Sequence, residues 1–132
     1  MVTKSGHAFV RDHSVPTFGE AWRDETGMVW SNALRRNQKV AHLDRATATE
    51  VCKSIGAELP TVRDYERQVV DGEILGGGVE AQFPPNLTGD VFWTSTPQPN
   101  YPSRGFVCNV YTPCYDLGEN NPNVAVRCVA RR

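Results

Sequence analysis

The stretch DRATATEVCKSIG, residues 44–56, is the part of the sequence that decides the expected fold. Its apolar residues recur at the spacing i, i+3, i+4, i+7, which places them on one face of a helix. These residues are Ala48, Val51, Cys52 and Ile55. Asp44 is a suitable N-cap and Gly56 a suitable left-handed terminator. The pattern therefore predicts a helix whose buried face carries a cysteine.

A second helix is predicted just downstream of the first. Pro60 disfavours helix before it, Thr61 can cap the new helix, and Asp64 suits its first turn. The inner face and the terminating glycine would be Val62, Tyr65, Val69 and Gly72. The two helices therefore follow one another directly along the chain.

Strand patterns flank the two helices. Residues 21–30 indicate a β-hairpin, because two runs that each contain a tryptophan enclose a polar turn in which Gly27 can take positive φ. A short strand is also expected at residues 8–11. Later strand patterns cover residues 91–95, 106–111 and 123–130. The rest of residues 72–90 and 95–123 is expected to form irregular loops.

The predicted elements indicate an α+β fold in a single domain. Two short helices would pack on a small, twisted antiparallel sheet with long irregular loops. With 132 residues the chain is long enough to bury a core. We expect residues 1–20 to be a lead-in segment or the end of a stalk, and residues 21–132 to form the domain.

Charge and hydropathy exclude two kinds of partner. The 14 basic and 15 acidic side chains give a formal net charge of -1. The chain therefore has no excess positive charge with which to bind a nucleic-acid backbone. No apolar stretch is long enough to span a bilayer, so membrane insertion is not expected.

The four cysteines suggest two disulfides and an oxidising compartment. They allow three pairings, which the expected elements rank. Cys108 and Cys114 lie close in sequence with Pro113 between them, so they could staple the loop after a strand. Cys52 and Cys128 would then join the first helix to the last strand. A zinc site is disfavoured, because no two cysteines have the short spacing of paired zinc ligands.

The location expected from the cysteines is the cell exterior or the cell surface. Residues 1–10 lack the continuous apolar run that a signal peptide needs, since they include Lys4, Gly6 and His7. We therefore expect the sequence to be the terminal module of a longer exported chain.

Five short signatures occur in order along residues 20–130. They are DETGMVW at 24–30, the helix that contains Cys52, ELPT at 58–61, FWTST at 92–96 and VRCV at 126–129. In this order they resemble the C-terminal domain of bacterial collagen-like adhesins, a family with a C-type-lectin-like fold. One long and one short disulfide would also match the general C-type lectin arrangement.

The resemblance implies an extracellular binding module. Domains of this family are often homotrimeric at the end of a fibre or stalk, and they recognise surface glycans or other cell-surface molecules. The alternatives are a structural trimerising cap of a fibre and a phage-type receptor-binding tip, which the same fold carries. An enzyme is not expected, because the acidic residues are scattered and His13 and His42 stand alone in the sequence.

The calcium site of sugar-binding C-type lectins is not expected in this chain. The tripeptide QPN at 98–100 resembles the calcium-binding tripeptide of those lectins, but it follows closely after Trp93 and no Trp-Asn-Asp comes after it. No carboxylate occurs between residues 91 and 115, whereas calcium requires six to eight oxygen ligands. A different oxygen-rich group, interpreted as a solvated loop, comprises Asp116, Glu119, Asn120 and Asn123. We predict no metal and no cofactor.

The expected ligand-binding residues lie around the loops of the second half of the chain. Tyrosines there combine an aromatic body with a polar tip, which suits sugar stacking and protein contacts. The candidates are Trp93, Gln98, Asn100, Tyr101, Arg104, Tyr111, Tyr115 and Asn120. A core position is the alternative for Trp93, since it follows Phe92 in a strand. Basic groups at residues 35–39 and 131–132 would favour a sulfated glycan if they converged in space.

Overall fold

The computed structural model describes residues 8–18, 21–31, 33–36, 39–67, 91–108 and 114–131. In this part of the chain two helices, α1 (Arg45–Ser54) and α2 (Val62–Tyr65), and a 3-10 turn (Pro16–Phe18) accompany eleven strands. The strands are β1 (Phe9–Arg11), β2 (Ala21–Asp24), β3 (Val29–Ser31), β4 (Arg35–Arg36), β5 (Lys39–Val40), β6 (His42–Leu43), β7 (Phe92–Pro97), β8 (Arg104–Cys108), β9 (Tyr115–Gly118), β10 (Val124–Ala125) and β11 (Val129–Ala130). The predicted α+β class is confirmed.

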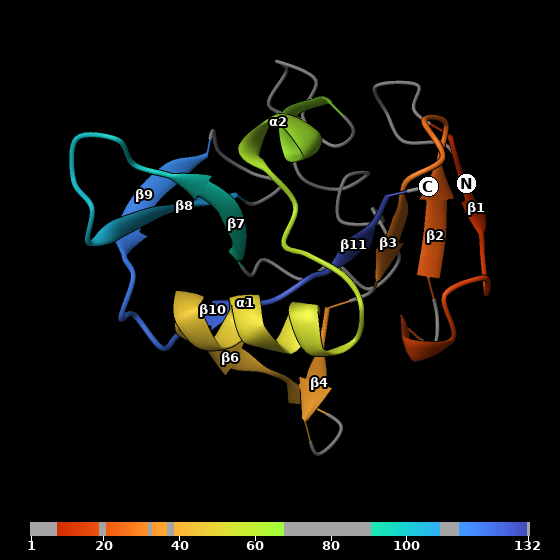
Figure 1. Ribbon diagram of the computed structural model, residues 1–132, viewed down its shortest axis with the longest axis horizontal. Helices are drawn as coiled ribbons and strands as arrows, with labels where there is room; N and C mark the ends of the chain where they lie inside the picture. The colour runs from red at the N-terminus through yellow and green to blue at the C-terminus, as the bar shows by residue number, and fades with distance from the viewer. Residues whose placement is uncertain are drawn as a thin grey trace.

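The strands form two main sheets and a two-stranded ribbon (Figure 1). One sheet has the order β1-β2-β3-β11, the other has the order β6-β10-β7-β8-β9, and β4 pairs with β5. Paired strands are antiparallel except β10 and β7, which run parallel where Ala125 lies beside Phe92. The strands are therefore divided between two sheets, instead of forming the single sheet expected.

The predicted hairpin is the β2–β3 pair, in which Trp22 lies opposite Trp30. Gly27 has φ of 91°, as the turn requires. The buried Asp24 carboxylate organises the turn, because it accepts hydrogen bonds from Thr26 and from the Trp30 indole at 2.9 Å. The expected strand at residues 8–11 is β1, which pairs with β2.

Helix α1 begins and ends close to the predicted residues. The Asp44 carboxylate accepts from the Thr47 backbone N–H at 2.8 Å, and Gly56 follows the helix with φ of 77°. Ala48 and Cys52 are the buried residues of the helix. Asp44 and Gly56 thus cap α1 as predicted. Of its predicted buried face, Ala48 and Cys52 are buried and Val51 and Ile55 are half-buried.

Helix α2 is shorter than predicted within the described residues. Thr61 and Asp64 form a capping box, and Tyr65 is buried. The helix spans only Val62–Tyr65, and the predicted positions Val69 and Gly72 lie outside the described residues. Its first turn is held to β7 through a hydrogen bond from the Val62 N–H to the Thr96 hydroxyl at 3.0 Å.

The predicted strand over residues 123–130 is two strands in two different sheets. β10 belongs to the five-stranded sheet and β11 to the four-stranded sheet. Val126, Arg127 and Cys128 connect them and are all buried. The prediction of one continuous strand was wrong, because a segment that crosses between sheets through the core is buried on every side and does not follow a two-residue alternation.

The predicted loop over residues 95–123 contains a strand, β9. The short strands β4, β5 and β6 lie within residues 35–43, where no element was predicted. Neither segment has a run of β-branched residues, so local propensity gives little signal for strands. β9 forms because β8 pairs with it over four residues, from Arg104 opposite Gly118 to Val107 opposite Tyr115.

The core consists of two apolar clusters on opposite faces of the five-stranded sheet. The cluster that contains Tyr65 of α2 comprises Phe9, Trp22, Met28, Trp30, Tyr65, Phe92, Cys108, Ala125 and Val129. The cluster under α1 comprises Ala48, Cys52, Leu59, Trp93, Val107, Val124, Val126 and Cys128. Phe92 and Trp93 are neighbours on β7 and enter different clusters, as strand alternation requires. Figure 1 shows α1 and α2 on opposite sides of the strands between them.

Both expected disulfides are present. Cys52 of α1 is bonded to Cys128, and Cys108 at the end of β8 is bonded to Cys114. All four cysteines of the chain are therefore used, a pattern typical of proteins from oxidising compartments. Among the described helices, neither has the length and apolar character needed to cross a bilayer.

Candidate functional site

A group of exposed and half-buried polar side chains lies at the tip of the β7–β8 hairpin. The turn that joins the two strands is closed by backbone bonds from Tyr101 to Gln98 and from Arg104 to Tyr101. A further backbone bond, from the Glu119 N–H to the Ser103 carbonyl at 2.9 Å, holds the turn after β9 beside it. We call this group the hairpin-tip cluster: Gln98, Asn100, Tyr101, Arg104, Asp116 and Asn120.

Asp116 links the side chains of the hairpin-tip cluster. Its carboxylate accepts from Arg104 Nε at 3.0 Å and from Gln98 Nε2 at 3.2 Å. The hydrogen bonds from Arg104 and then Gln98 hold the pKa of Asp116 below its ordinary value. Arg104 and Asp116 meet because they are diagonal neighbours on one face of the β8–β9 pair. The carboxylate is ionised and fixed in position, with lone pairs left to accept further hydrogen bonds.

The candidate aromatic residues are placed differently from one another. Tyr101 is in the hairpin turn and is 59% exposed, so its ring is available beside the polar group. Tyr115 is 40% exposed but lies at the far end of β9, and alternation turns it to the face opposite Asp116. Tyr111 lies outside the described residues. Tyr101 is therefore the aromatic residue of the hairpin-tip cluster.

Trp93 is not part of any surface site in the described structure. It is fully buried under α1, and its indole N–H donates to the Leu43 carbonyl at 2.7 Å. Its predicted ligand contact is corrected accordingly, because the whole ring and its one donor are used inside the core. The alternative prediction, a core position for Trp93, is confirmed.

The side chain of Arg45 holds the hairpin tip in place by binding the backbone of β7. Arg45 was not among the candidate site residues predicted from the sequence. Its guanidinium donates to the carbonyls of Thr94 and Ser95 and to the Glu119 carboxylate at 3.0 Å. The two carbonyls are accessible because the register of β7 against β8 shifts in this stretch. A basic residue at the first position of a helix is unfavourable, because its charge opposes the helix dipole. This unfavourable position is the one local sign that the Arg45 side chain interacts outside its own helix.

Gly105 makes room for Arg45. A Cβ at this position would lie 2.4 Å from Arg45 Cδ, well inside contact distance. The glycine therefore lets the arginine cross β8 and reach the hairpin tip. This close approach fixes the tip against α1, so the polar groups above it are held in place without a ligand.

A shallow hollow of about 330 Å³ lies between α1 and the turn after β9. It is lined by Arg45, Ala46, Thr49, Glu50, Glu119 and Asn120. Carboxylate, amide and hydroxyl groups predominate among these side chains, which suits hydrogen bonding to a ligand with many hydroxyls. Asn120 follows Glu119, whose backbone N–H is bonded to the Ser103 carbonyl, so the hollow lies next to the hairpin-tip cluster.

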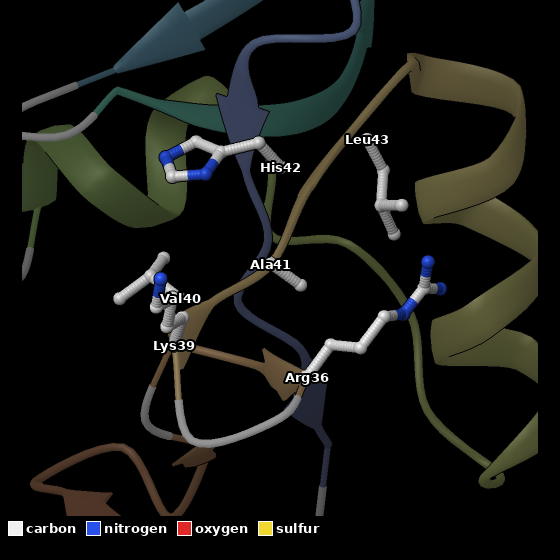
Figure 2. A pocket seen from close by; sticks show the side chains of 6 residues that line it. All are labelled: Arg36, Lys39, Val40, Ala41, His42 and Leu43. Carbon is white, nitrogen blue, oxygen red and sulfur yellow. The ribbon is translucent and has the colours of Figure 1, made fainter.

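A second hollow, of about 430 Å³, lies by the β4–β5 ribbon (Figure 2). Its lining includes the basic residues Arg36, Lys39 and His42. Figure 2 shows Arg36 extending on the side of Leu43, while His42 points to the other side of the strand. The basic groups of the ribbon thus make a positive surface and do not converge on one point.

Arg131, in the second basic group, does not join this positive surface. Its guanidinium donates to the Asp64 carboxylate at 2.6 Å and also pairs with Glu58. Arg132 lies outside the described residues. A sulfated glycan was expected only if the basic groups at residues 35–39 and 131–132 converged in space. The described residues of these two groups do not converge. In the same residues no three His, Cys, Asp or Glu side chains are grouped so as to hold a metal ion.

Comparisons of the chain with protein-family models, with curated proteins and with solved structures find no match. The features of the chain that bear on function are therefore the hairpin-tip cluster, its support by Arg45 and the disulfides.

Proposed function

We propose that this chain is an extracellular ligand-binding module with a C-type-lectin-like fold, similar to the C-terminal domain of bacterial collagen-like adhesins. It recognises a glycan or another molecule on a cell surface through the hairpin-tip cluster. The observation that carries the proposal is an exposed tyrosine, Tyr101, beside the fixed group formed by Gln98, Arg104 and Asp116.

The chemistry of the cluster suits a sugar. The Tyr101 ring offers an aromatic face on which the apolar side of a pyranose can stack. Asn100 and Asn120 are exposed and present amides that both donate and accept. Asp116 provides a carboxylate that accepts from hydroxyls. Because Arg45 holds the tip in place, binding requires little ordering of this surface.

The disulfides support an extracellular or cell-surface location. Both bridges join segments of the folded domain, and the longer one connects α1 to the segment between the two sheets. A cytosolic protein would be kept reduced and would gain nothing from them. The location also fits a ligand on a cell surface.

A trimerising cap of a fibre and a phage-type receptor-binding tip are the alternative functions. Tyr115 favours the cap, since it is exposed on β9, the edge strand of the five-stranded sheet. An edge strand can be covered by a neighbouring subunit. Light scattering separates this alternative: the cap requires a trimer, and a monomer in solution contradicts it.

A glycan array tests the proposed site. The folded chain is compared with Tyr101→Ala and with Gln98→Ala, two changes in exposed or partly exposed side chains that leave both disulfides intact. We expect the wild type to bind a defined set of glycans and both variants to lose at least tenfold in affinity, or about 1.4 kcal/mol. Unchanged binding by both variants contradicts the proposed site.

A further inference from the structure

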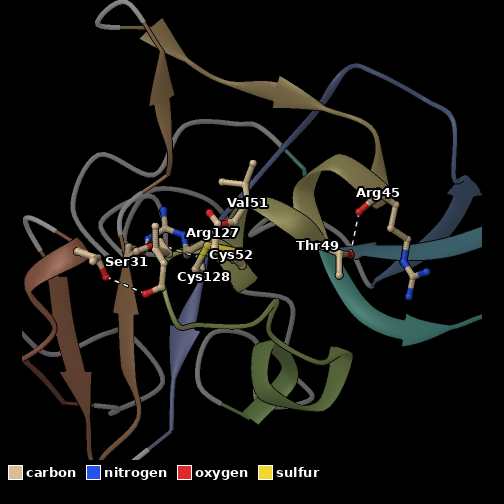
Figure 3. Close-up of a disulfide and its surroundings, with 10 residues drawn as sticks. Ser31, Arg45, Thr49, Val51, Cys52, Arg127 and Cys128 are labelled. Atoms are coloured by element: carbon tan, nitrogen blue, oxygen red, sulfur yellow. Dashed lines mark hydrogen bonds between the residues drawn. A yellow bond between two sulfur atoms is a disulfide. The ribbon is translucent and has the colours of Figure 1, made fainter.

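Arg127 is a fully buried cation at the centre of the molecule. It lies in the segment that crosses from β10 to β11 and is 0% exposed. Figure 3 shows it beside the Cys52–Cys128 disulfide and close to Ser31. A guanidinium in such a position requires compensation, because a buried charge without a partner is costly.

Only part of the guanidinium is compensated by the described residues. Nη1 donates to the Ser31 carbonyl at 2.8 Å, and the guanidinium carbon lies 5.0 Å from the centre of the Phe92 ring. No carboxylate of the described residues pairs with it. Nε and Nη2 are buried and have no hydrogen-bond partner in this part of the structure.

The two unpartnered groups form one edge of the guanidinium. The N–H bonds of Nε and Nη2 point the same way and make the two-pronged fork with which arginine holds an anion. The hydroxyl of Tyr65 is also buried without a hydrogen-bond partner in the described residues. Both side chains contribute to the packing around Phe92, since Tyr65 belongs to its apolar cluster and Arg127 lies over its ring.

The protonation states of the two groups leave the positive charge in place. Burial lowers the pKa of Arg127 to about 10, so the guanidinium is still charged at neutral pH. Burial raises the pKa of Tyr65 above its ordinary value, so its hydroxyl stays protonated and cannot act as the counter-ion. A water molecule would satisfy hydrogen bonds but would leave the charge unbalanced.

We propose that Arg127 and Tyr65 form an internal site for one small monoanion, of the size and charge of chloride. The Nε–Nη2 fork and the Tyr65 hydroxyl would be its donors, and the ion would be taken up as the chain folds. The ion would be a structural ligand that ties the segment between the two sheets to α2. This proposal is independent of the hairpin-tip cluster and of any surface ligand.

Urea unfolding in chloride and in gluconate tests the anion site. The chain is unfolded and refolded without chloride, and its unfolding midpoint is then measured in sodium chloride or sodium gluconate at the same ionic strength, up to 0.1 M. We expect the midpoint to rise with chloride and with bromide and to stay level with the larger gluconate. A hundredfold excess of chloride over its dissociation constant raises the folding equilibrium constant about 100-fold.

Three variants locate the chloride effect. Arg127→Met removes the charge and should abolish the response to chloride. Tyr65→Phe keeps the ring and removes one donor, so the chloride concentration for half the effect should rise several-fold; this variant remains informative if Arg127→Met does not fold. Arg63→Met removes an exposed positive charge on the same helix as Tyr65 and should respond like the wild type.

Equal midpoints in chloride and gluconate for the wild type overturn the proposal, as does a Tyr65→Phe variant that responds like the wild type. A crystal grown in sodium bromide gives a second, structural result. An anomalous peak in contact with Arg127 Nε and Nη2 supports the site. Ordered water, or a carboxylate of the chain itself, in that position overturns it.

Discussion

Removing the Cys52–Cys128 bridge should destabilise the domain far more than removing the Cys108–Cys114 bridge. The first closes a sequence separation of 76 residues and the second a separation of 6. The chain-entropy relation gives about 4.5 kcal/mol for the long loop and about 2 kcal/mol for the short one. Against the 5–15 kcal/mol of a typical domain, the difference of about 2 kcal/mol is readily measured.

The two bridges provide matched variants, Cys52→Ala/Cys128→Ala and Cys108→Ala/Cys114→Ala, each of which lacks one disulfide. Urea unfolding of both, followed by circular dichroism, gives the two changes in the free energy of unfolding. The variant without the long bridge should also show a larger m value, because its unfolded chain exposes more surface. If the short bridge proves equally or more stabilising, loop closure is not the main contribution of the disulfides.

Three further changes probe the support of the hairpin tip and the core. Gly105→Ala should destabilise the domain by about 1–3 kcal/mol and weaken ligand binding, since the new methyl group displaces Arg45; urea unfolding and binding measure the two effects. Trp93→Phe should cost about 1–3 kcal/mol in the same unfolding assay without changing ligand binding, because it removes a buried hydrogen bond and part of a buried ring in the core. Hydrogen bonds from Ser14 lower the pKa of Asp12 from 3.8 to about 2; the resulting stability is therefore present above about pH 4 and is lost as the pH falls toward 2. Asp12→Asn should flatten that part of the pH–stability profile measured by thermal unfolding.

Features fixed by neighbouring residues could be predicted from the sequence. The cap and buried face of α1 depend on residues within one or two turns, so Asp44, Cys52 and Gly56 indicated them directly. The same holds for the β2–β3 hairpin with Gly27. Once Cys52 was placed on the buried face of a helix, the pairing with Cys128 followed from the expected positions of the two segments.

Features that depend on distant residues were not predictable in the same way. Apart from Arg127, the segment from Val124 to Ala130 consists of small and apolar residues, and only the position of both sheets explains why it divides between them. β9 forms through its pairing with β8. The role of Arg45 depends on a shift in the register of β7 and on a glycine 60 positions away, neither of which a local pattern contains. The neighbours of Trp93 in the sequence fit a core position and a ligand-binding position equally well. Trp93 is buried because α1 packs over it.

The most direct test of the proposed function compares Tyr101→Ala with Tyr115→Ala in one binding assay. Both tyrosines are exposed, but Tyr101 lies in the turn that joins β7 to β8, whereas Tyr115 lies at the start of β9. With the strongest glycan found on the array, measured by titration calorimetry, Tyr101→Ala should bind at least tenfold more weakly than the wild type, and Tyr115→Ala should bind like the wild type. Equal affinities for Tyr101→Ala and the wild type, or a loss confined to Tyr115→Ala, would contradict ligand recognition by the hairpin-tip cluster.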